Sequence, residues 1–316
     1  MSPVAWRMQA RRHRNVLSGD AVLGPVVVGG IGGSGTRVIE EIMRRLNVYT
    51  GSDLNAAGDN RWFTLLCKLP RWDLDARTLE SPVMRALGTF ERVMTGRLEF
   101  TRQDRQVVTD SVRRCRHWWR HDRLPDDRPP AWLHDRIASL LRSGQDYPPN
   151  APLWGWKEPN SHIFIRPLHV QFGDRLRYVH VIRNGIHMAH SRNQLQLSRW
   201  GSVFGLPGGS GTPSPAASLD YWILANEAAI EEGQALARGG FLLMNYDDLC
   251  AAPEREITRF VDFLGLDPPA GVLRELACVP RPSTSGRRSD SEVAKEFGND
   301  RLTRVRALGF PVGGSR

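Results

Sequence analysis

The sequence predicts an α/β fold, a doubly wound and mostly parallel sheet that carries a helical insertion. Three observations support this prediction. Short apolar or β-branched runs alternate with segments of helical periodicity, as in repeated strand–helix units. The first of these runs ends in glycines and leads directly into a helical segment. With 316 residues, of which 41% are hydrophobic and 24% charged, the chain is long enough for one large domain with an insertion.

The first predicted unit is a strand, a glycine-rich loop and a helix. Val26 to Val28 form a short β-branched run, which is typical of a strand buried on both faces of a parallel sheet. Apolar residues then recur at helical intervals, so we expect a helix to follow Gly35 and to stop near Asn47. Its apolar face consists of Val38, Ile39, Ile42, Met43 and Leu46. The glycine loop is therefore expected at the N-terminus of a helix.

Two further units follow in the middle of the chain. Leu153 to Lys157 is a short strand candidate, and a helix with Ser161 as its N-cap is expected from Ser161 to about Phe172. Leu176 to Ile182 is the next strand candidate. It is followed by a turn at Arg183 and by a helix from about Gly185 to Leu195.

The last predicted unit follows a stretch rich in Gly, Pro and Ser from Gly201 to Ser218. This stretch is too long for a plain connection, so we expect it to be mobile or functional. Ser218 can then N-cap a helix through about Arg238, and Phe241 to Met244 form another strand. Pro253 is expected to start a helix that ends near Gly265. In a sheet of this kind, ligands bind outside the carboxyl ends of the strands.

We expect one domain with a looser segment at each end. Residues 1–20 form a basic N-terminal arm, and residues 21–282 form the single α/β domain. Within this domain, residues 60–145 are mostly helical in pattern and are expected to cap the sheet. Residues 283–316 are polar and charged, which is typical of a lid or a loose end.

The composition excludes several classes of protein. No stretch approaches the roughly 18 apolar residues that a membrane span needs. Arginines occupy the N-terminal positions where a signal peptide is apolar, so we expect a cytoplasmic location. The four cysteines form no C-x-x-C pair, which argues against a zinc site or a disulfide framework and favours ordinary buried thiols. The net charge of +9 suits either a polyanion or a phosphate-bearing small molecule, and charge alone does not choose between them.

The segment from Gly29 to Arg37 has the chemistry of an anion site. Its glycines let successive N–H groups point inward, and the N-terminus of the following helix adds partial positive charge. Ser34 and Thr36 can donate hydroxyl hydrogen bonds, and Arg37 can form a bidentate pair with a phosphate. The alternative is a glycine turn that serves only close packing of the strand against the helix.

This loop differs from that of an ordinary ATPase or GTPase. From Gly30 the glycine spacing matches a Walker A loop, but Thr36 and Arg37 stand where Lys and Ser/Thr belong. The strand over Leu176 to Ile182 ends in Arg183 and not in an aspartate that could hold a metal through water. We therefore expect a phosphate-binding loop without a metal ligand set.

The Ser-Gly-Thr of the loop resembles the sulfotransferases that use 3′-phosphoadenosine-5′-phosphosulfate (PAPS), a family with a P-loop type of fold. The resemblance extends from about Val26 to Leu266, and residues 60–145 match only loosely. It implies that the loop cradles the 5′-phosphosulfate of the donor through Gly32, Gly33, Ser34, Gly35, Thr36 and Arg37. Gly33 occupies the place of a lysine or arginine that members of this family use on the transferring group.

Two later segments extend the resemblance to the rest of the nucleotide. Arg183 at a strand end and Ser191 eight residues later are similar to the 3′-phosphate site of the family, where a guanidinium fork and a hydroxyl suit a terminal phosphate. By itself, an Arg and a Ser at this spacing is more often a surface pair. Tyr246 begins a Y-D-D-L segment similar to one whose tyrosine lies beside the nucleotide. The basic pair Arg287 and Arg288 resembles the C-terminal loop that closes over the 3′-phosphate.

The resemblance also indicates the catalytic groups. Lys157, followed by Glu and Pro, resembles the K-D-P segment of tyrosylprotein sulfotransferases, in which the lysine stabilises the transferring sulfuryl group. With Gly33 lacking a side chain, Lys157 and Arg37 are the cations best suited to offset charge on the bridging oxygen. Asp53 or Asp59 can take the place of the family's catalytic base. Each of these three residues also has a purely structural interpretation. Lys157 can be the solvated end of a strand, and Asp53 and Asp59 can be residues of a helix stop and a turn.

These features together imply a PAPS-dependent sulfotransferase that needs no metal and acts on a small-molecule, sugar or peptide acceptor, with no nucleic-acid partner. Two alternatives stay open. The first is a P-loop nucleotide kinase, and the second is a noncatalytic module that binds a nucleotide or a polyanion. The sequence does not identify the acceptor or the oligomeric state.

Overall fold

The computed structural model describes residues 23–68, 81–97, 101–115, 129–146, 148, 151, 153–191, 194–207, 213–236, 239–281 and 290–312. Within them the chain forms a single sheet of five strands in the order β2-β3-β1-β4-β5, and every neighbouring pair is parallel. The strands are β1 (Leu23–Gly30), β2 (Val48–Tyr49), β3 (Leu153–Lys157), β4 (Arg177–Ile182) and β5 (Phe241–Asn245). The predicted doubly wound parallel sheet is confirmed.

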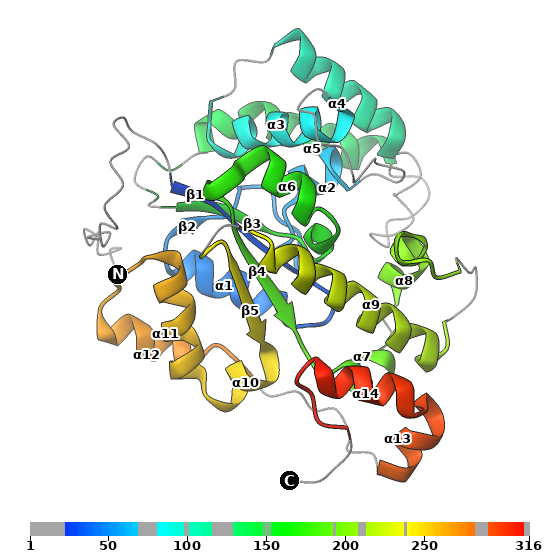
Figure 1. The fold of residues 1–316 in the computed structure, drawn as a ribbon. Coiled ribbons are helices and arrows are strands. Elements are labelled where there is room, and N and C mark those ends of the chain that lie inside the picture. Colours follow the sequence, from blue (N-terminus) through cyan, green and yellow to red (C-terminus); the bar gives the residue numbers. More distant parts are fainter. Residues whose placement is uncertain are drawn as a thin grey trace.

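Helices cover both faces of the sheet (Figure 1). On one face lie α1 (Thr36–Arg45), α10 (Tyr246–Ala251), α11 (Pro253–Leu264) and α12 (Ala270–Ala277). On the other lie α6 (Ile165–Phe172), α7 (Gly185–Ala189), α8 (Leu195–Trp200) and α9 (Pro215–Gln234). This second face also carries the helical cap, made of α2 (Arg61–Leu66), α3 (Pro82–Met94), α4 (Arg102–Cys115) and α5 (Pro129–Asp146).

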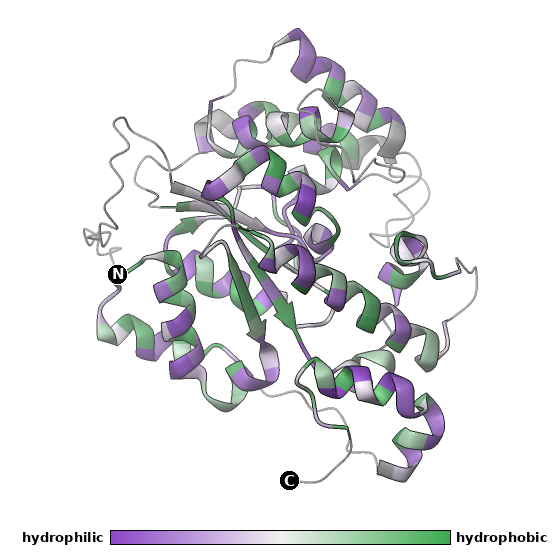
Figure 2. Ribbon diagram, in the orientation of Figure 1, coloured by the Kyte–Doolittle hydropathy of each residue, from purple (hydrophilic) through white to green (hydrophobic). Residues whose placement is uncertain are grey.

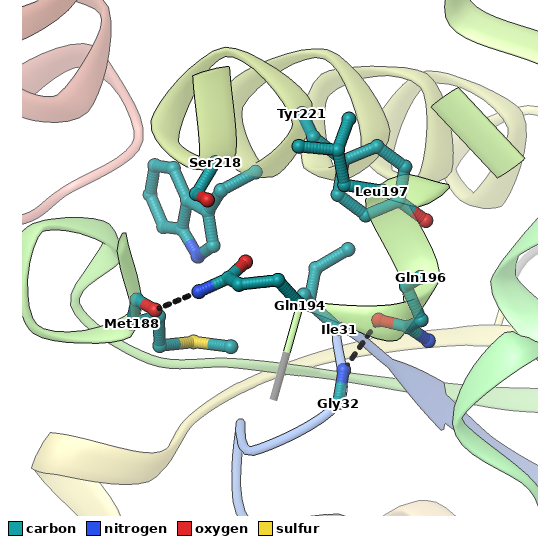
Figure 3. A pocket seen from close by; sticks show the side chains of 9 residues that line it. Ile31, Gly32, Met188, Gln194, Gln196, Leu197, Ser218 and Tyr221 are labelled. Atoms are coloured by element: carbon teal, nitrogen blue, oxygen red, sulfur yellow. Dashed lines mark hydrogen bonds between the residues drawn. The ribbon is translucent and has the colours of Figure 1, made fainter. Parts of the chain in front are cut away.

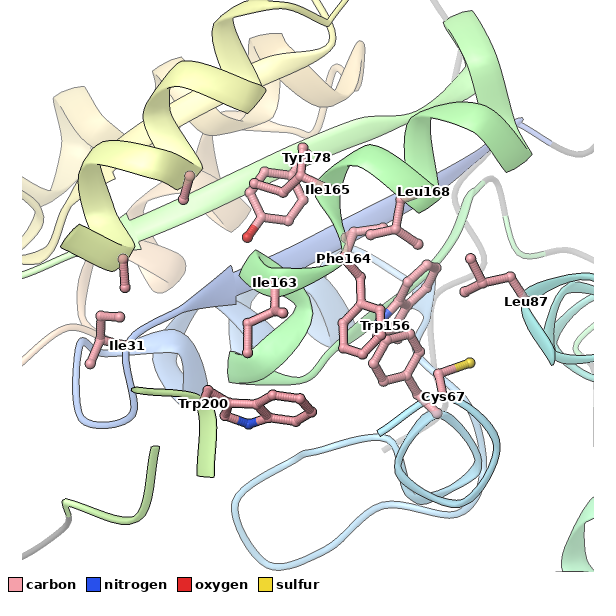
Figure 4. Close-up of a cluster of buried hydrophobic side chains, with 14 of the residues drawn as sticks. Ile31, Cys67, Leu87, Trp156, Ile163, Phe164, Ile165, Leu168, Tyr178 and Trp200 are labelled. Atoms are coloured by element: carbon pink, nitrogen blue, oxygen red, sulfur yellow. The ribbon is translucent and has the colours of Figure 1, made fainter. Parts of the chain in front are cut away.

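The core has two parts because β1 points successive side chains to opposite faces. Val26 and Val28 pack with the apolar face of α1, whereas Val27 packs with the tryptophans of β3 on the side of the cap. Figure 2 shows β4 and β5 mostly in the green of hydrophobic residues, and Figure 4 shows the aromatic cluster around Trp156 and Phe164. All these side chains are buried, and their close packing holds β1 and β3 in place. The glycine loop, which follows β1, therefore starts from a well-packed strand.

Several element ends differ from the predicted ones. The short strand β2 was not predicted, because its two residues are too few to show a period. Ser161 caps no helix: the Glu158 side chain accepts the N-capping hydrogen bond of a 3₁₀ helix over Pro159–Ile163, and α6 begins only at Ile165. The N-cap of α9 is Ser214, so Ser218 lies inside that helix.

The helix expected from Gly185 to Leu195 is shorter than predicted, and the next helix, α8, begins only at Leu195. It ends as α7 at Ala189 because the Gln194 side chain donates to the carbonyls of Met188, Ala189 and Ser191, which closes the helix end. The chain then starts again as α8. An amide side chain five residues beyond a helix end gives no signal in the periodicity, so the sequence did not reveal this break.

The C-terminal part is more ordered than expected. Residues 290–307 form α13 (Asp290–Phe297) and α14 (Asn299–Ala307), which pack on α9 through Phe297, Leu302 and Val305. They are therefore no loose end. Cys278 is exposed and is not a buried thiol. The N-terminal arm, together with Arg287 and Arg288, lies outside the described residues. None of the helices in the described part of the chain is long and apolar enough to cross a membrane.

Candidate active site

The glycine loop connects β1 to α1 and owes its shape to two close approaches. At Gly30, an added Cβ would lie 2.4 Å from the carbonyl oxygen of Val181 on the neighbouring strand. Gly35 has φ of +103° and would place a Cβ 2.1 Å from the ring of Tyr246. Gly35 is also the N-cap residue of α1, in the left-handed conformation that other residues rarely adopt. These two glycines let the loop turn tightly against β4 and α10.

Several N–H groups of the loop have no hydrogen-bond acceptor in the part of the chain that the structure describes. Within the described residues, no acceptor lies against the N–H groups of Gly33, Gly35, Thr36 and Arg37. They stand at the N-terminus of α1, where the helix dipole favours a bound anion. The Ser34 hydroxyl is fully buried and has no hydrogen-bond partner in the same part of the chain. A tetrahedral anion would satisfy these donors, so the loop fits a phosphate or sulfate group.

Arg183 reaches the same loop from the end of β4. Its Nη1 donates to the carbonyl of Gly33 at 3.2 Å, and its guanidinium carbon lies 5.8 Å from the centre of the Tyr246 ring. The strand pairing explains this position, because β1 and β4 are neighbours and end together, with Gly30 opposite Val181. The structure therefore brings together the loop, Arg183 and Tyr246, which are far apart in the sequence.

The residues around Arg183 hold it in place. The Asn184 N–H donates to Oδ2 of Asp247 at 3.0 Å, and the Asn184 side chain caps α7. Tyr246 donates its hydroxyl to the carbonyl of Arg281 at 3.0 Å, and burial raises the pKa of this hydroxyl. Ser191 lies just beyond α7, half-buried, with its N–H on the carbonyl of Met188, and not within a longer helix as expected.

Lys157 and Asp59 form one buried ion pair. The Lys157 ammonium is 2.5 Å from Oδ1 of Asp59 and 2.7 Å from the carbonyl oxygen of Ala57, and its side chain is 2% exposed. A tight turn orients the aspartate, because the Asn55 side chain accepts from the N–H groups of Ala57 and Asp59. Glu40 of α1 lies nearby, and burial raises the pKa of its carboxyl while Arg44 and Lys157 act in the opposite direction.

Asp53 lies in a different environment. Its carboxylate pairs with Arg136 of α5 at 2.5 Å, and with Arg61 at 3.7 Å, and it accepts a hydrogen bond from the Ser139 hydroxyl. It is nearly buried and ties the loop after β2 to the helical cap. The two candidate bases are thus separated in role: Asp59 contacts Lys157, and Asp53 contacts the cap.

A family model described as "Sulfotransferase family" matches residues 25–269, which includes the loop, Lys157, Arg183 and Tyr246. The chain belongs to the sulfotransferase family. No curated protein matches it. Its fold resembles that of the sulfotransferase STF9 from Mycobacterium avium, at 14% identity and a TM-score of 0.51, over 94% of this chain and 79% of the other. The sulfotransferase domain of the Synechococcus PCC 7002 olefin synthase also aligns, at 14% identity and a TM-score of 0.43, over 94% and 99% of the two chains.

The sulfotransferase also contains a chain of hydrogen bonds that the sequence did not reveal. The Gly32 N–H donates to Oε1 of Gln196 at 2.6 Å, and Nε2 of Gln196 donates to Oδ1 of Asn160 at 2.9 Å. Asn160 in turn donates to Glu158, which also pairs with Lys68 at 2.7 Å. Because the Glu158 carboxylate only accepts, it fixes the orientation of both amides along the chain. Gly32 and Glu158 belong to motifs of the sequence, but no motif marks Asn160 and Gln196, which connect them.

His162, which lies two residues beyond Asn160 in the same 3₁₀ helix, is buried. Its Nδ1 lies 2.9 Å from the carbonyl oxygen of Pro159, so Nδ1 carries the proton and Nε2 accepts from the hydroxyl of Tyr221 at 3.3 Å. Burial lowers the pKa of His162 to about 3 and that of His180 to about 4. Both are neutral at pH 7, and His162 is poorly suited to hold a proton.

Metal ligands do not cluster in the described part of the sulfotransferase: no group of three or more His, Cys, Asp or Glu side chains there has a geometry that could hold an ion.

Proposed function

We propose that this sulfotransferase moves a sulfuryl group from PAPS to a hydroxyl or amine of an acceptor. The observation that carries the proposal is the convergence of two kinds of anion-binding group at one loop. Four N–H groups at the N-terminus of α1 have no acceptor among the described residues, and the Arg183 guanidinium contacts the same loop at Gly33. Family membership and fold support sulfotransferase activity, and a donor with two anionic ends suits this pairing.

In the proposed complex the 5′-phosphosulfate lies on the loop from Gly32 to Arg37. There its oxygens accept hydrogen bonds from the backbone N–H groups and the buried Ser34 hydroxyl that have no partner among the described residues. Arg183 and Ser191 hold the 3′-phosphate, and the Tyr246 ring lies beside the nucleotide. A groove between α1 and α12, lined in part by Val38, Cys278 and Arg281, starts one turn along α1 from the loop. We assign it to the adenosine.

Lys157 is the cation that we propose for the transferring group, together with Arg37. In the reaction, the acceptor oxygen or nitrogen bonds to sulfur, and the bond between sulfur and the bridging oxygen breaks. The electron pair of that bond stays on the oxygen of adenosine 3′,5′-bisphosphate, and the acceptor loses one proton. A cation near the bridging oxygen stabilises the negative charge that develops there.

Asp59 is the residue that we propose to receive this proton. It is the only one of the two candidate aspartates that contacts Lys157, and its carboxylate is 19% exposed, so solvent and substrate can reach it. Asp53 is already engaged by Arg136, Arg61 and Ser139, and we assign it a structural role.

The test is transfer of ³⁵S from labelled PAPS to an acceptor panel of phenols, simple sugars and tyrosine peptides, with EDTA present throughout. We expect a labelled product and an equal amount of adenosine 3′,5′-bisphosphate. In a parallel assay with magnesium in place of EDTA, magnesium-dependent consumption of ATP together with no response to PAPS would instead show a nucleotide kinase. Tight binding of PAPS with no transfer to any acceptor would show a noncatalytic module.

A further inference from the structure

Trp222 of α9 holds the turn that carries Arg183 at the end of β4. Its indole is buried, and Nε1 donates to the carbonyl oxygen of Arg183 at 3.1 Å. The ring also packs directly on the backbone of the turn, because a Cβ added at Gly185 would lie 2.5 Å from it. Ser218, one helical turn before Trp222, lines the small pocket of Figure 3 together with Met188 of α7. This face of α9 is therefore packed against α7.

The last described helix, α14, supports this tryptophan. It ends at Gly309, whose φ is +88°, and the Gly309 N–H donates to the carbonyl of Arg306 at 2.9 Å. The next N–H, that of Phe310, donates to the carbonyl of Val305 at 3.2 Å. These two bonds form a Schellman motif, which turns the chain at the end of a helix. Beyond the turn, the Phe310 ring is 3% exposed and meets that of Trp222 edge-on, with the ring centres 5.7 Å apart.

The residue after Phe310 contacts the same turn directly. The carbonyl oxygen of Pro311 accepts a hydrogen bond from Nδ2 of Asn184 at 3.1 Å. The Asn184 side chain is buried, its Oδ1 caps α7, and its backbone N–H donates to α10. Phe310 and Pro311 therefore act on two successive residues: the first supports Arg183 through Trp222, and the second holds Asn184 by a hydrogen bond.

Two ion pairs fix the position of α14 on α9. Arg301 forms a bidentate pair with Asp220, at 2.6 and 2.8 Å. Arg304 pairs with Glu227, with Nε and Oε1 2.9 Å apart. The two acids are seven residues apart, about two turns of helix, so they point to the same side of α9. Because a bidentate pair fixes direction as well as distance, α14 is held along α9 in one register (Figure 1). In this register its C-terminal end lies at the turn that carries Arg183.

We infer that Phe310 and Pro311 are positioning residues of the donor site, which hold the turn so that the Arg183 guanidinium is in place for the 3′-phosphate. The inference rests on the proposed function. An arginine side chain is long, so the place of its fork depends on the backbone from which it starts. The Arg183 fork lies between the Gly33 carbonyl and the Tyr246 ring, and a small shift of the turn would move it away from both.

The test compares adenosine 3′,5′-bisphosphate with adenosine 5′-monophosphate, by calorimetry at a temperature where each variant is folded. Phe310→Ala should weaken the bisphosphate by about tenfold, which is within the range for residues of one contact network, and change the monophosphate by less than about twofold. Phe310→Leu keeps most of the apolar volume and should fold even if the alanine variant does not. It should show the same selectivity with a smaller loss, about threefold.

The matched control is Phe172→Ala. Phe172 is also 3% exposed and also meets a tryptophan edge-on, since its ring centre is 5.9 Å from that of Trp154. Trp154 lies near the start of β3, away from the carboxyl ends of the strands. This variant should lose stability but keep the wild-type ratio of the two affinities. When Arg183→Ala is already present, Phe310→Ala should weaken the bisphosphate by less than about twofold more, because the side chain that it positions is gone.

Hydrogen exchange of the ligand-free protein gives an independent readout. Exchange of the α7 amides should be faster in Phe310→Ala and close to wild type in Phe172→Ala, because a short helix opens locally once its cap is loosened. An unchanged affinity ratio in both Phe310 variants, additive losses in the double variant, or unchanged exchange in α7 would each overturn the inference and leave the donor assignment standing. A wild-type protein that binds the bisphosphate no better than the monophosphate would refute the 3′-phosphate assignment, and the inference with it.

Discussion

Replacement of Arg183 by alanine tests the link between the strand end and the donor. The guanidinium is half-buried, contacts the loop at Gly33 and lies against the Tyr246 ring, so a bound 3′-phosphate meets a fork that is already in place. Removing one partner of such a charge-assisted pair costs about 2–4 kcal/mol. The affinity for adenosine 3′,5′-bisphosphate should therefore fall by roughly 30- to 1000-fold. Arg183→Lys should lie in between, because lysine keeps the charge but not the fork.

The assay is isothermal titration calorimetry with two ligands, adenosine 3′,5′-bisphosphate and adenosine 5′-monophosphate, on wild type and variant. Because the monophosphate lacks the group that Arg183 is proposed to bind, its affinity should change far less. Arg175→Ala is the control: this arginine precedes the opposite end of β4, is 48% exposed and pairs with Glu91. Equal losses for both ligands, or an unchanged affinity for the bisphosphate, would refute the assignment of Arg183 to the 3′-phosphate.

Three further predictions follow, two from the same site and one from the buried histidines. Lys157→Met should lower kcat by roughly 100-fold or more with little change in donor affinity; a change in KM alone, measured by initial rates, contradicts a role in the transition state. Gly35→Ala should lower both the melting temperature and the donor affinity, because the new Cβ meets the Tyr246 ring; a variant that binds normally shows that the loop can relax. His162 and His180 have lower pKa values in the folded protein than in the unfolded chain. As the pH falls, these histidines are therefore protonated in the unfolded chain at a higher pH than in the folded protein. The free energy of unfolding in urea should therefore fall below pH 6.5, by about 1.4 kcal/mol per pH unit for each histidine, and a flat profile between pH 7 and pH 5 contradicts this.

Apart from β2, the strands and the glycine loop could be predicted because their signals are local. A β-branched run, a glycine cluster and an amphipathic helix follow one another between Val26 and Leu46, and the structure has β1, the loop and α1 there. The end of α11 at Gly265, in the left-handed conformation, was likewise predictable from the glycine. A parallel sheet then aligns the strand ends, so Arg183 had to finish near the loop once the order of the strands was known.

The remaining parts of the site depend on contacts between distant segments. Whether Asp53 or Asp59 meets Lys157 depends on the path of the loop after β2, which no period in the sequence reports. The N-cap of α9 is Ser214 and not Ser218 as expected, because both serines lie near the helix start and either side chain can cap a helix.

The most direct measurement is the melting temperature of the intact protein with adenosine 3′,5′-bisphosphate, compared with each of the two adenosine monophosphates and with magnesium ATP. A ligand that occupies both the loop and Arg183 at a hundred times its dissociation constant should raise the melting temperature by roughly 5 °C or more. Each monophosphate at the same concentration should give a much smaller shift. An equal shift with a single monophosphate, or a larger one with magnesium ATP, would contradict the claim that one nucleotide is held at both ends.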